Sequence, residues 1–375
     1  MRLFDTALCE LGRRDRERWR VLAGESGVQS PYLLPDFADM VDAARGDVRV
    51  IVAEENAAPV GYFAFHKPVG GIARPVGAPL SDVQGFASAK PLKVDPGALL
   101  DAMGAEALVY DNWLGPAPGR VRERAGSAVI DLSQGADAWR DRRRGLHKSH
   151  FKKIAQRRRK AEREFGDVRI VFGDPQGERF AALKAWKSAQ YRDSGLADLF
   201  ETGWTAKVFE AAALRGFGPL RGLTASLYLG GKLAAVETGL VAGGTYHSWT
   251  PAYDRAFAAV SPGLLLLEGI IDAAGELGLS RIDLGKGEQA YKAYYTDFET
   301  PLSAGRALQP GFAGARVAAW ELAEAAGAIL PGPLGAAPVK LRRRWAQSAA
   351  LAPAYAERLK LMAGAFAAAP KRIAA

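Results

Sequence analysis

The stretch that decides the fold is SLYLGGKLAAVETGLVAGGTYHSWTPAYD, residues 226–254, followed six residues later by SPGLLLLEGIIDAAGELGLSRIDLG, residues 261–285. The first segment predicts three strands joined by two Gly-Gly turns, because glycine adopts the positive-φ conformations that tight hairpins require. The second predicts a helix with Ser261 as its N-cap and Pro262 as its first residue, ending near Gly278 and followed at once by a strand. Together they predict an α/β unit.

The earlier part of the chain carries a weaker version of the same pattern. Residues 48–65 predict two strands joined by a turn at Glu55 and Asn56, and residues 107–113 predict a further strand after a helix within 91–103. The strands around Asp111 and Asp283 lie at nearly equal distances beyond their respective hairpins. This spacing favours duplication of one α/β unit.

A strongly basic segment separates the two halves. Residues 140–163 contain 12 Lys and Arg against 2 Asp and Glu, and predict a helix from about Leu146 to Gly166. Its apolar stripe is thin, so most of its surface faces water or an anionic partner. A solvated helix bridging the halves, a polyanionic acceptor, a lipid surface and RNA all remain open as explanations. Two further helices are expected at residues 180–193 and 203–214.

The residues after about Gly305 are rich in Ala, Pro and Arg and predict a helical tail. Residues 301–375 contain 10 Lys and Arg against 3 Asp and Glu. Packing against the catalytic domain and peripheral contact with an anionic membrane are both compatible with such helices.

Length and composition suit a cytoplasmic protein with two domains and an appendage. The chain has 375 residues, 49% of them hydrophobic and 24% charged, and a net charge of +9. Its single cysteine, Cys9, excludes an internal disulfide and favours a reducing compartment. We expect no secretory signal, because charges are scattered through the first 20 residues, and no apolar run long enough to span a membrane. The expected divisions are 1–139, 140–166, 167–304 and 305–375.

The predicted helix start at Ser261 is the first candidate binding site. A helix N-terminus offers unpaired N–H groups and a partial positive charge, which suit a pyrophosphate. By itself, Ser-Pro-Gly is equally consistent with an ordinary helix start. The candidate positions are Val260, Ser261, Pro262, Gly263 and Leu264.

Four motifs together, YHSWTPAYD, SPGLLLLEGI, IDLGKG and AYK, resemble the GNAT-superfamily acetyltransferases of the CelD type, named for cellulose biosynthesis and related to the FemAB aminoacyl transferases. The resemblance spans residues 48–298 and is most specific after Trp186. It implies two tandem GNAT-like domains with mixed, mostly antiparallel sheets flanked by helices, and a donor site only in the second domain. The chain departs from ordinary GNAT enzymes because it lacks their glutamine- or arginine-rich Gly-x-Gly phosphate loop.

The resemblance also implies the chemistry. Acetyl-CoA or another acyl-CoA would be the co-substrate, and the amine or hydroxyl of a small-molecule or saccharide acceptor would attack the thioester directly. Such N- or O-acyl transfer would belong to polysaccharide or cell-envelope metabolism. The enzyme must position both substrates, remove a proton from the acceptor and stabilise the departing thiolate.

Three residues of the strand region are candidates for this work. His247 is the first candidate for the base, since its ordinary pKa is near neutrality, although a half-buried strand histidine would look the same. Glu237 could serve as base, orient His247, or simply face solvent. Asp254 fits an Asx-type turn better than direct catalysis.

The segment after the last strand of the second motif adds two candidates. Tyr291 could protonate the thiolate and Lys292 could bind a phosphate or an oxyanion, while Tyr294 and Tyr295 compete for the phenol role or pack in the core. The four histidines and the lone cysteine show no zinc-site spacing, so we expect no metal.

Two other classes of function remain open from the sequence. A FemAB-like transferase would take its acyl group from aminoacyl-tRNA, with the basic segment contacting the tRNA. A non-catalytic polyanion or membrane adaptor would keep the GNAT scaffold without its activity.

Overall fold

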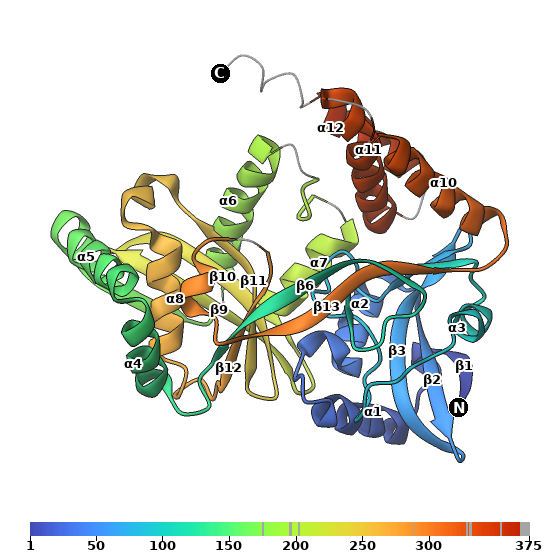
Figure 1. The fold of residues 1–375 in the computed structure, drawn as a ribbon. Coiled ribbons are helices and arrows are strands. Elements are labelled where there is room, and N and C mark those ends of the chain that lie inside the picture. Colours follow the sequence, from blue (N-terminus) through green and yellow to red (C-terminus); the bar gives the residue numbers. More distant parts are fainter. Residues whose placement is uncertain are drawn as a thin grey trace.

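One large twisted sheet organises the molecule. The computed structural model describes residues 1–174, 176–194, 197–201, 203–287, 289–327, 329, 332–352 and 355–367. Within them, thirteen strands form a single sheet in the order β1-β2-β3-β4-β5-β13-β6-β12-β11-β10-β9-β7, with β8 paired to β9 (Figure 1). Most neighbours are antiparallel, and helices flank the sheet. The predicted α/β class with mixed, mostly antiparallel strands is confirmed.

The first half of the sheet is built around an antiparallel hairpin. The expected strands at 48–65 and 107–113 are present, and β4 pairs with β5 in parallel. The helix expected within 91–103 begins at Pro96, because the Asp95 side chain accepts the Ala98 N–H and caps it there. The elements are β1 (Arg2–Ala7), α1 (Arg13–Glu25), α2 (Pro35–Arg45), β2 (Val48–Glu55), β3 (Ala58–Val69), β4 (Ile72–Pro75), α3 (Pro96–Met103) and β5 (Ala107–Leu114).

The second half repeats this order of parts. Its three-stranded meander turns at Gly230–Gly231 and Gly243–Gly244, all with positive φ, and β11 then pairs with β12 in parallel across a connecting helix. The helix ends at Asp272, before the expected Gly278. The elements are β7 (Val168–Phe172), α6 (Glu178–Ser194), α7 (Gly203–Leu214), β8 (Gly216–Phe217), β9 (Leu220–Leu229), β10 (Lys232–Ala242), β11 (Thr245–Tyr253), α8 (Pro262–Asp272), β12 (Arg281–Lys286) and α9 (Lys292–Tyr295).

The two halves exchange their last strands. Strand β6 (Arg120–Asp131) comes from the first half of the sequence but pairs with β12, and β13 (Phe298–Leu308) comes from the second half but pairs with β5. The two exchanged strands also pair with each other at the middle of the sheet. The expected divisions at 139 and 304 therefore do not mark spatial limits, because β6 precedes the first and β13 crosses the second.

The basic segment forms two helices where one was expected. α4 (Ala136–Leu146) and α5 (Lys148–Phe165) are separated at His147, and Gly166 ends α5 as the sequence predicts. Only a narrow set of side chains on these helices is buried, and it packs against α8 and the second half of the sheet. The buried side chains of this face are Trp139, Arg143, Phe151, Ile154 and Ala161.

The tail helices dock on the first half of the sheet and on α7 of the second half. The Ala313 N–H donates to Glu106 Oε2 at 2.5 Å, and Trp204 Nε1 donates to the Leu351 carbonyl at 2.9 Å. Figure 1 shows these helices above the ends of β3 and β13. The tail comprises α10 (Phe312–Gly327), α11 (Gly332–Leu351) and α12 (Tyr355–Ala367), and residues 368–375 lie outside the described residues. No helix in the described ranges is long and apolar enough to cross a membrane.

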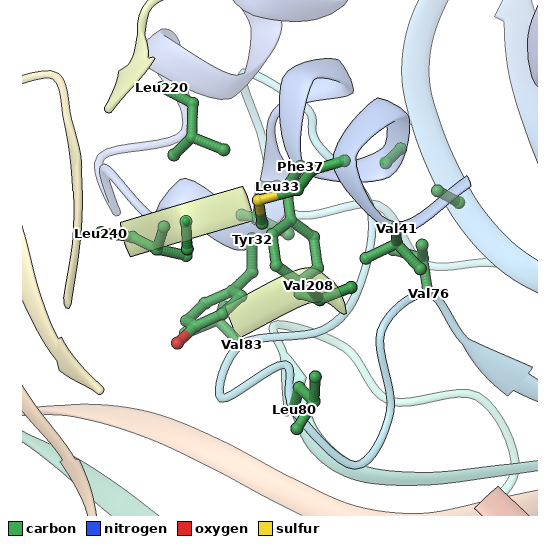
Figure 2. Close-up of a cluster of buried hydrophobic side chains, with 14 of the residues drawn as sticks. Tyr32, Leu33, Phe37, Val41, Val76, Leu80, Val83, Val208, Leu220 and Leu240 are labelled. Atoms are coloured by element: carbon green, nitrogen blue, oxygen red, sulfur yellow. The ribbon is translucent and has the colours of Figure 1, made fainter. Parts of the chain in front are cut away.

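A shared hydrophobic cluster joins the two halves. Figure 2 shows Phe37 and Val41 of α2 beside Val208 of α7, with Leu240 of β10 contributing from the meander. All four side chains are fully buried. Because this cluster draws on both halves, the two should unfold together rather than as independent units.

Gly222 allows α7 to lie directly on β9. A Cβ at this position would collide with the Ala212 carbonyl oxygen, which is backbone and cannot move alone. We expect Gly222→Ala to lower the free energy of unfolding by about 1–3 kcal/mol. Gly145→Ala is the matched control, since a Cβ there meets nothing within 4 Å. Denaturant unfolding of both variants checks this, and a Gly222→Ala protein as stable as the control would contradict the packing.

Candidate functional site

The two parallel strands of the second half separate and leave a cavity between them. β11 and β12 pair only where Thr245, Tyr246 and His247 face residues 281–283. Beyond this point a cavity of about 640 Å³ opens between Ser248–Tyr253 of β11 and Leu284–Lys286 of β12, with α6 and the start of α8 as further walls. Such a wedge admits an extended ligand along the edge of β11.

The corresponding wedge of the first half is filled by the chain itself. β4 and β5 also pair briefly, and residues 84–87, which follow β4, then lie between β3 and β5, with Ala87 bridged to Tyr62 and Gln84 to Trp113. The Gln84 N–H donates to the Asn112 carbonyl at 2.8 Å, and the Leu114 N–H donates to the Gln84 carbonyl at 2.7 Å. This inserted segment closes the gap in the first half. Among the described residues, the open wedge therefore lies in the second half.

The start of α8 forms one wall of the cavity, with Ser261 at the N-cap position and Pro262 as the first helical residue, as expected. Ser261 lines the cavity together with Pro262, Gly263 and Leu264, but it adopts a left-handed conformation with φ of 54° and its side chain caps no N–H. Val260 is fully buried in the core, so its proposed role at the site is not supported.

In this turn, the backbone N–H of Gly263 is available to donate a hydrogen bond to a ligand. The Ser261 N–H donates to Ala258, the Leu264 N–H donates to Ser261, and Pro262 has no N–H. A Cβ on Gly263 would meet nothing within 4 Å, so the space beside this amide is open.

Glu237 on β10 is a buried carboxyl that lines the cavity. It is only 4% exposed, and Tyr246 donates its hydroxyl hydrogen to Glu237 Oε1 at 2.8 Å. Burial raises the pKa of Glu237, against the opposing hydrogen bonds from Ser248 and Tyr246. It is therefore not the solvent-facing strand residue that the sequence also allowed, and its raised pKa makes it a stronger base than an exposed carboxylate.

Tyr291 is the tyrosine that lines the cavity. Burial and then the charge of Glu237 raise its pKa to about 12, so its phenol keeps its proton at neutral pH. Tyr295 is instead fully buried and donates to Glu268 at 2.8 Å, while Tyr294 stacks on His150 at a centroid distance of 4.0 Å.

Lys292 lies beside Tyr291 at the end of β12. Its Nζ donates to the Gly285 carbonyl at 2.9 Å, and burial lowers its pKa. The side chain also lines the cavity. This ammonium therefore holds the strand end and remains close to any anionic group bound in the wedge.

His247 is sealed between two carboxylates and does not line the cavity. Its Nε2 lies 2.9 Å from Asp82 Oδ2 and its Nδ1 lies 3.6 Å from Asp283 Oδ2. Although burial lowers the pKa of His247, Asp283 and Asp82 raise it to about 10. A protonated imidazole cannot accept a proton, so the proposed role as base is not supported. Through Asp82 and Asp283, His247 instead connects β11 to the first half and to β12 at the point where the wedge begins.

Asp254 caps the short helix between β11 and α8. Its Oδ1 accepts the Ala256 N–H at 2.9 Å, at the start of a 3-10 helix (Arg255–Val260). It does not line the cavity, so the Asx turn accounts for it and a catalytic role does not.

Four charged residues that line the cavity were not anticipated from the sequence: Asp82, Lys187, Arg255 and Lys286. Lys187 on α6 lines the cavity, and its Nζ donates to the Pro251 carbonyl at 3.1 Å. The adjacent Trp186 and Lys187 in this helix were the available signal. Asp82 lines the cavity from the first half, and nothing local in its Gly- and Pro-rich surroundings indicates this. In the described ranges, no group of three or more His, Cys, Asp or Glu is placed to hold a metal ion.

Comparisons with known proteins identify the type of domain. Residues 148–293 match the family model of the acetyltransferase (GNAT) domain. None of the curated protein sequences matches the chain. This stretch, which is less than half of the chain, is therefore similar to a GNAT acetyltransferase domain.

Solved structures with low sequence identity share the overall fold. FemX has a TM-score of 0.50 at 10% identity, covering 78% of this chain and 94% of its own. A conserved protein of unknown function from Bacteroides thetaiotaomicron has a TM-score of 0.50 at 12% identity, covering 80% and 98%. A tandem GNAT protein from the clavulanic acid biosynthesis pathway has a TM-score of 0.48 at 12% identity, covering 83% and 99%.

Proposed function

We propose that this chain, with its GNAT-like domain, is an acyl-CoA-dependent N- or O-acyltransferase whose working site is the wedge between β11 and β12. The observation that carries the proposal is the cavity itself, where a helix start, a buried carboxyl and a buried phenol meet. The motif resemblance to CelD-type proteins extends the proposal to acetyl-CoA as donor and a saccharide or other small molecule as acceptor.

The donor fits the wedge by its chemistry. No strand pairs with the β12-facing edge of β11 beyond His247 in the described structure, so this edge can pair with the amides of a pantetheine arm. The open Gly263 amide and the positive end of the α8 dipole suit the diphosphate. Lys286 adds a cation on the opposite wall.

The acceptor is activated by Glu237 in this proposal. The carboxylate takes the proton from the attacking amine or hydroxyl, while Tyr246 and Ser248 hold it in place. A tetrahedral oxyanion forms at the thioester carbonyl, next to the Lys187 and Lys292 ammonium groups. Its collapse releases the thiolate, which takes the Tyr291 proton, so no covalent enzyme intermediate is needed.

Acetyl-CoA binding to a Gly263→Glu variant tests the donor site. The substitution has room, and an acidic residue in the first helical turn favours the helix, but its charge repels a phosphate. We expect affinity measured by calorimetry to fall at least 10-fold. Gly263→Gln, nearly the same in shape and uncharged, should lose clearly less. Equal affinity in both variants would place the diphosphate elsewhere, and no binding of any acyl-CoA to the unaltered protein would refute the proposed donor.

The basic face of α4 and α5 favours a second candidate, transfer from aminoacyl-tRNA. Six cations on this face form no ion pair with any described residue: Arg144, Lys148, Lys152, Lys153, Arg157 and Arg159. The same helices are tied to α9, because the Arg143 guanidinium donates to the Ala293 and Tyr294 carbonyls at 2.9 Å. A polyanion bound here would lie beside Tyr291 and Lys292.

Neutralising Lys152 and Lys153 separates the two candidates. For an acyl-CoA enzyme, Lys152→Gln/Lys153→Gln should leave acetyl-CoA affinity and turnover within about twofold, because both side chains are exposed. For a tRNA-dependent enzyme, the double variant should bind tRNA with a smaller salt dependence, its log–log slope reduced by about 0.7–0.9 for each lost phosphate contact. Titrations of tRNA at several salt concentrations, alongside acetyl-CoA calorimetry, decide between them.

A further inference from the structure

A second cavity lies between the tail helices and the first half of the sheet. It has a volume of about 100 Å³. Its floor is the face of β3, β4, β5, β13 and β6, and α10, α11 and α12 close it from above. Figure 1 shows these helices next to the ends of β3 and β13, away from α8 and the wedge between β11 and β12. It is therefore separate from the proposed transfer site.

The lining of this cavity is unusually cationic. Among the described residues, seven arginines and Lys67 line it, against the one carboxylate of Glu321. Three of the arginines are held by carboxylates: Arg306 by Glu321, Arg342 by Glu324, and Arg45 by Asp47. The first two of these ion pairs fasten the tail.

Arg74 is a half-buried arginine in the lining of this cavity. It lies on β4 at the floor of the cavity and forms no ion pair with any described residue. Burial lowers the pKa of Arg74; the charge of Asp111 opposes this effect, whereas the charges of Arg358 and Arg45 act in the same direction as burial. Keeping a half-buried guanidinium among like charges is costly unless an anion joins it.

The other side of the cavity is apolar. Trp320 of α10 and Trp345 of α11 face it from the tail, and Val69, Ile72 and Val109 contribute from the sheet. A plain inorganic anion would leave this part of the cavity unused. A ligand with an anionic end and a short hydrocarbon or ring would fill both parts.

We propose that this cavity binds a phosphate monoester with an apolar substituent, its phosphoryl group on Arg74 and its apolar part between Trp320 and Trp345. A doubly charged phosphoryl group suits several guanidinium forks, which recognise it through paired hydrogen bonds. Free metabolites and lipid headgroups both present this chemistry. The proposal does not depend on the acyl-transfer chemistry.

Calorimetry with octyl phosphate, inorganic phosphate and octyl glucoside tests the proposal on the full chain. Octyl phosphate should bind at least 10-fold more tightly than inorganic phosphate, and octyl glucoside should not bind. Arg74→Gln should weaken octyl phosphate at least 10-fold. Arg124→Gln, an exposed arginine on β6 outside the cavity, should change nothing. Trp320→Leu should weaken octyl phosphate but not inorganic phosphate.

Further measurements distinguish a loss of binding from a loss of folding, and a lipid ligand from a soluble one. The Arg74→Gln protein should keep the unfolding midpoint and acetyl-CoA affinity of the unaltered chain, which shows that only the cavity has changed. Arg74-dependent sedimentation with phosphatidic acid vesicles, absent with phosphatidylcholine alone, would identify a lipid headgroup; binding of octyl phosphate without vesicle binding would identify a soluble ligand. Failure of octyl phosphate to bind at millimolar concentration, or equal binding by Arg74→Gln, would overturn the proposal.

Discussion

Glu237→Gln is expected to lower kcat for acyl transfer by about 10²–10⁴-fold, the range that a general base contributes. The amide oxygen can still accept the Tyr246 hydroxyl, so the wedge should keep its shape. Acetyl-CoA affinity should stay within about twofold, because the carboxylate acts on the acceptor. Steady-state kinetics with an active acceptor, together with calorimetry for the donor, measure both effects.

The pH dependence of the acyl-transfer rate tests the role of Glu237 independently. Burial raises the pKa of Glu237, so the rate for the unaltered enzyme should fall on the acid side as this carboxylate is protonated. That limb should disappear in Glu237→Gln. Tyr246→Phe, which removes only the supporting hydrogen bond, should lose less activity and keep the limb. A Glu237→Gln enzyme within threefold of the unaltered rate would exclude Glu237 as base.

His247→Leu is expected to lower the free energy of unfolding by about 3–5 kcal/mol, because it leaves the Asp283 carboxylate buried without its counter-charge. The effect should reach the wedge, since His247 occupies the last position at which β11 and β12 pair. Denaturant unfolding measures the loss. The double variant His247→Leu/Asp283→Leu removes both buried charges and should recover much of the stability.

The same pair predicts how stability changes with pH. The folded-state pKa of His247, about 10, exceeds its ordinary value of 6.5, so its contribution is complete below about pH 6.5 and is lost as pH rises through 10. Burial raises the pKa of Asp283, but the charge of His247 together with the hydrogen bonds from His247, Ser127 and Gly285 lowers it overall in the fold. Its contribution is lost as pH falls into the acid range. His247→Leu should abolish the alkaline decline, and an unchanged decline would show that His247 is not charged in the fold.

Local signals in the sequence were sufficient for most of the elements around the wedge. Gly230–Gly231 and Gly243–Gly244 adopt the positive φ that their spacing predicts, and Pro262 begins α8. These features depend on a few adjacent residues, so no tertiary contact has to be known. The helix break at His147 was missed because its local signal, Gly145 two positions earlier, is also compatible with a continuous helix.

The roles of His247 and Asp82 could not be predicted in this way. The two residues are 165 positions apart and meet only because the segment after β4 reaches across to β11. A histidine on a strand looks the same whether it faces a cavity or two carboxylates, and only its burial between them reverses its expected charge. The choice among three tyrosines likewise depends on which way a helix of one turn, α9, is packed.

The exchange of β6 and β13 between the two halves could not be predicted from the sequence, for a related reason. Strand patterns predict that a segment is extended, but they do not say which neighbour it pairs with. Both strands are followed or preceded by connections long enough to cross the sheet. The tail cavity is similarly assembled from Arg74 and residues more than 200 positions later, without any sequence motif.

Amide hydrogen exchange with a non-reactive thioether analogue of acetyl-CoA tests whether the acyl donor binds between β11 and β12. Our account predicts ligand-dependent protection in residues 248–253 of β11 and 263–265 of α8, and none in residues 72–75 or 107–114 of the filled wedge. Protection confined to the first half, or to the tail, would contradict the placement of the donor between β11 and β12.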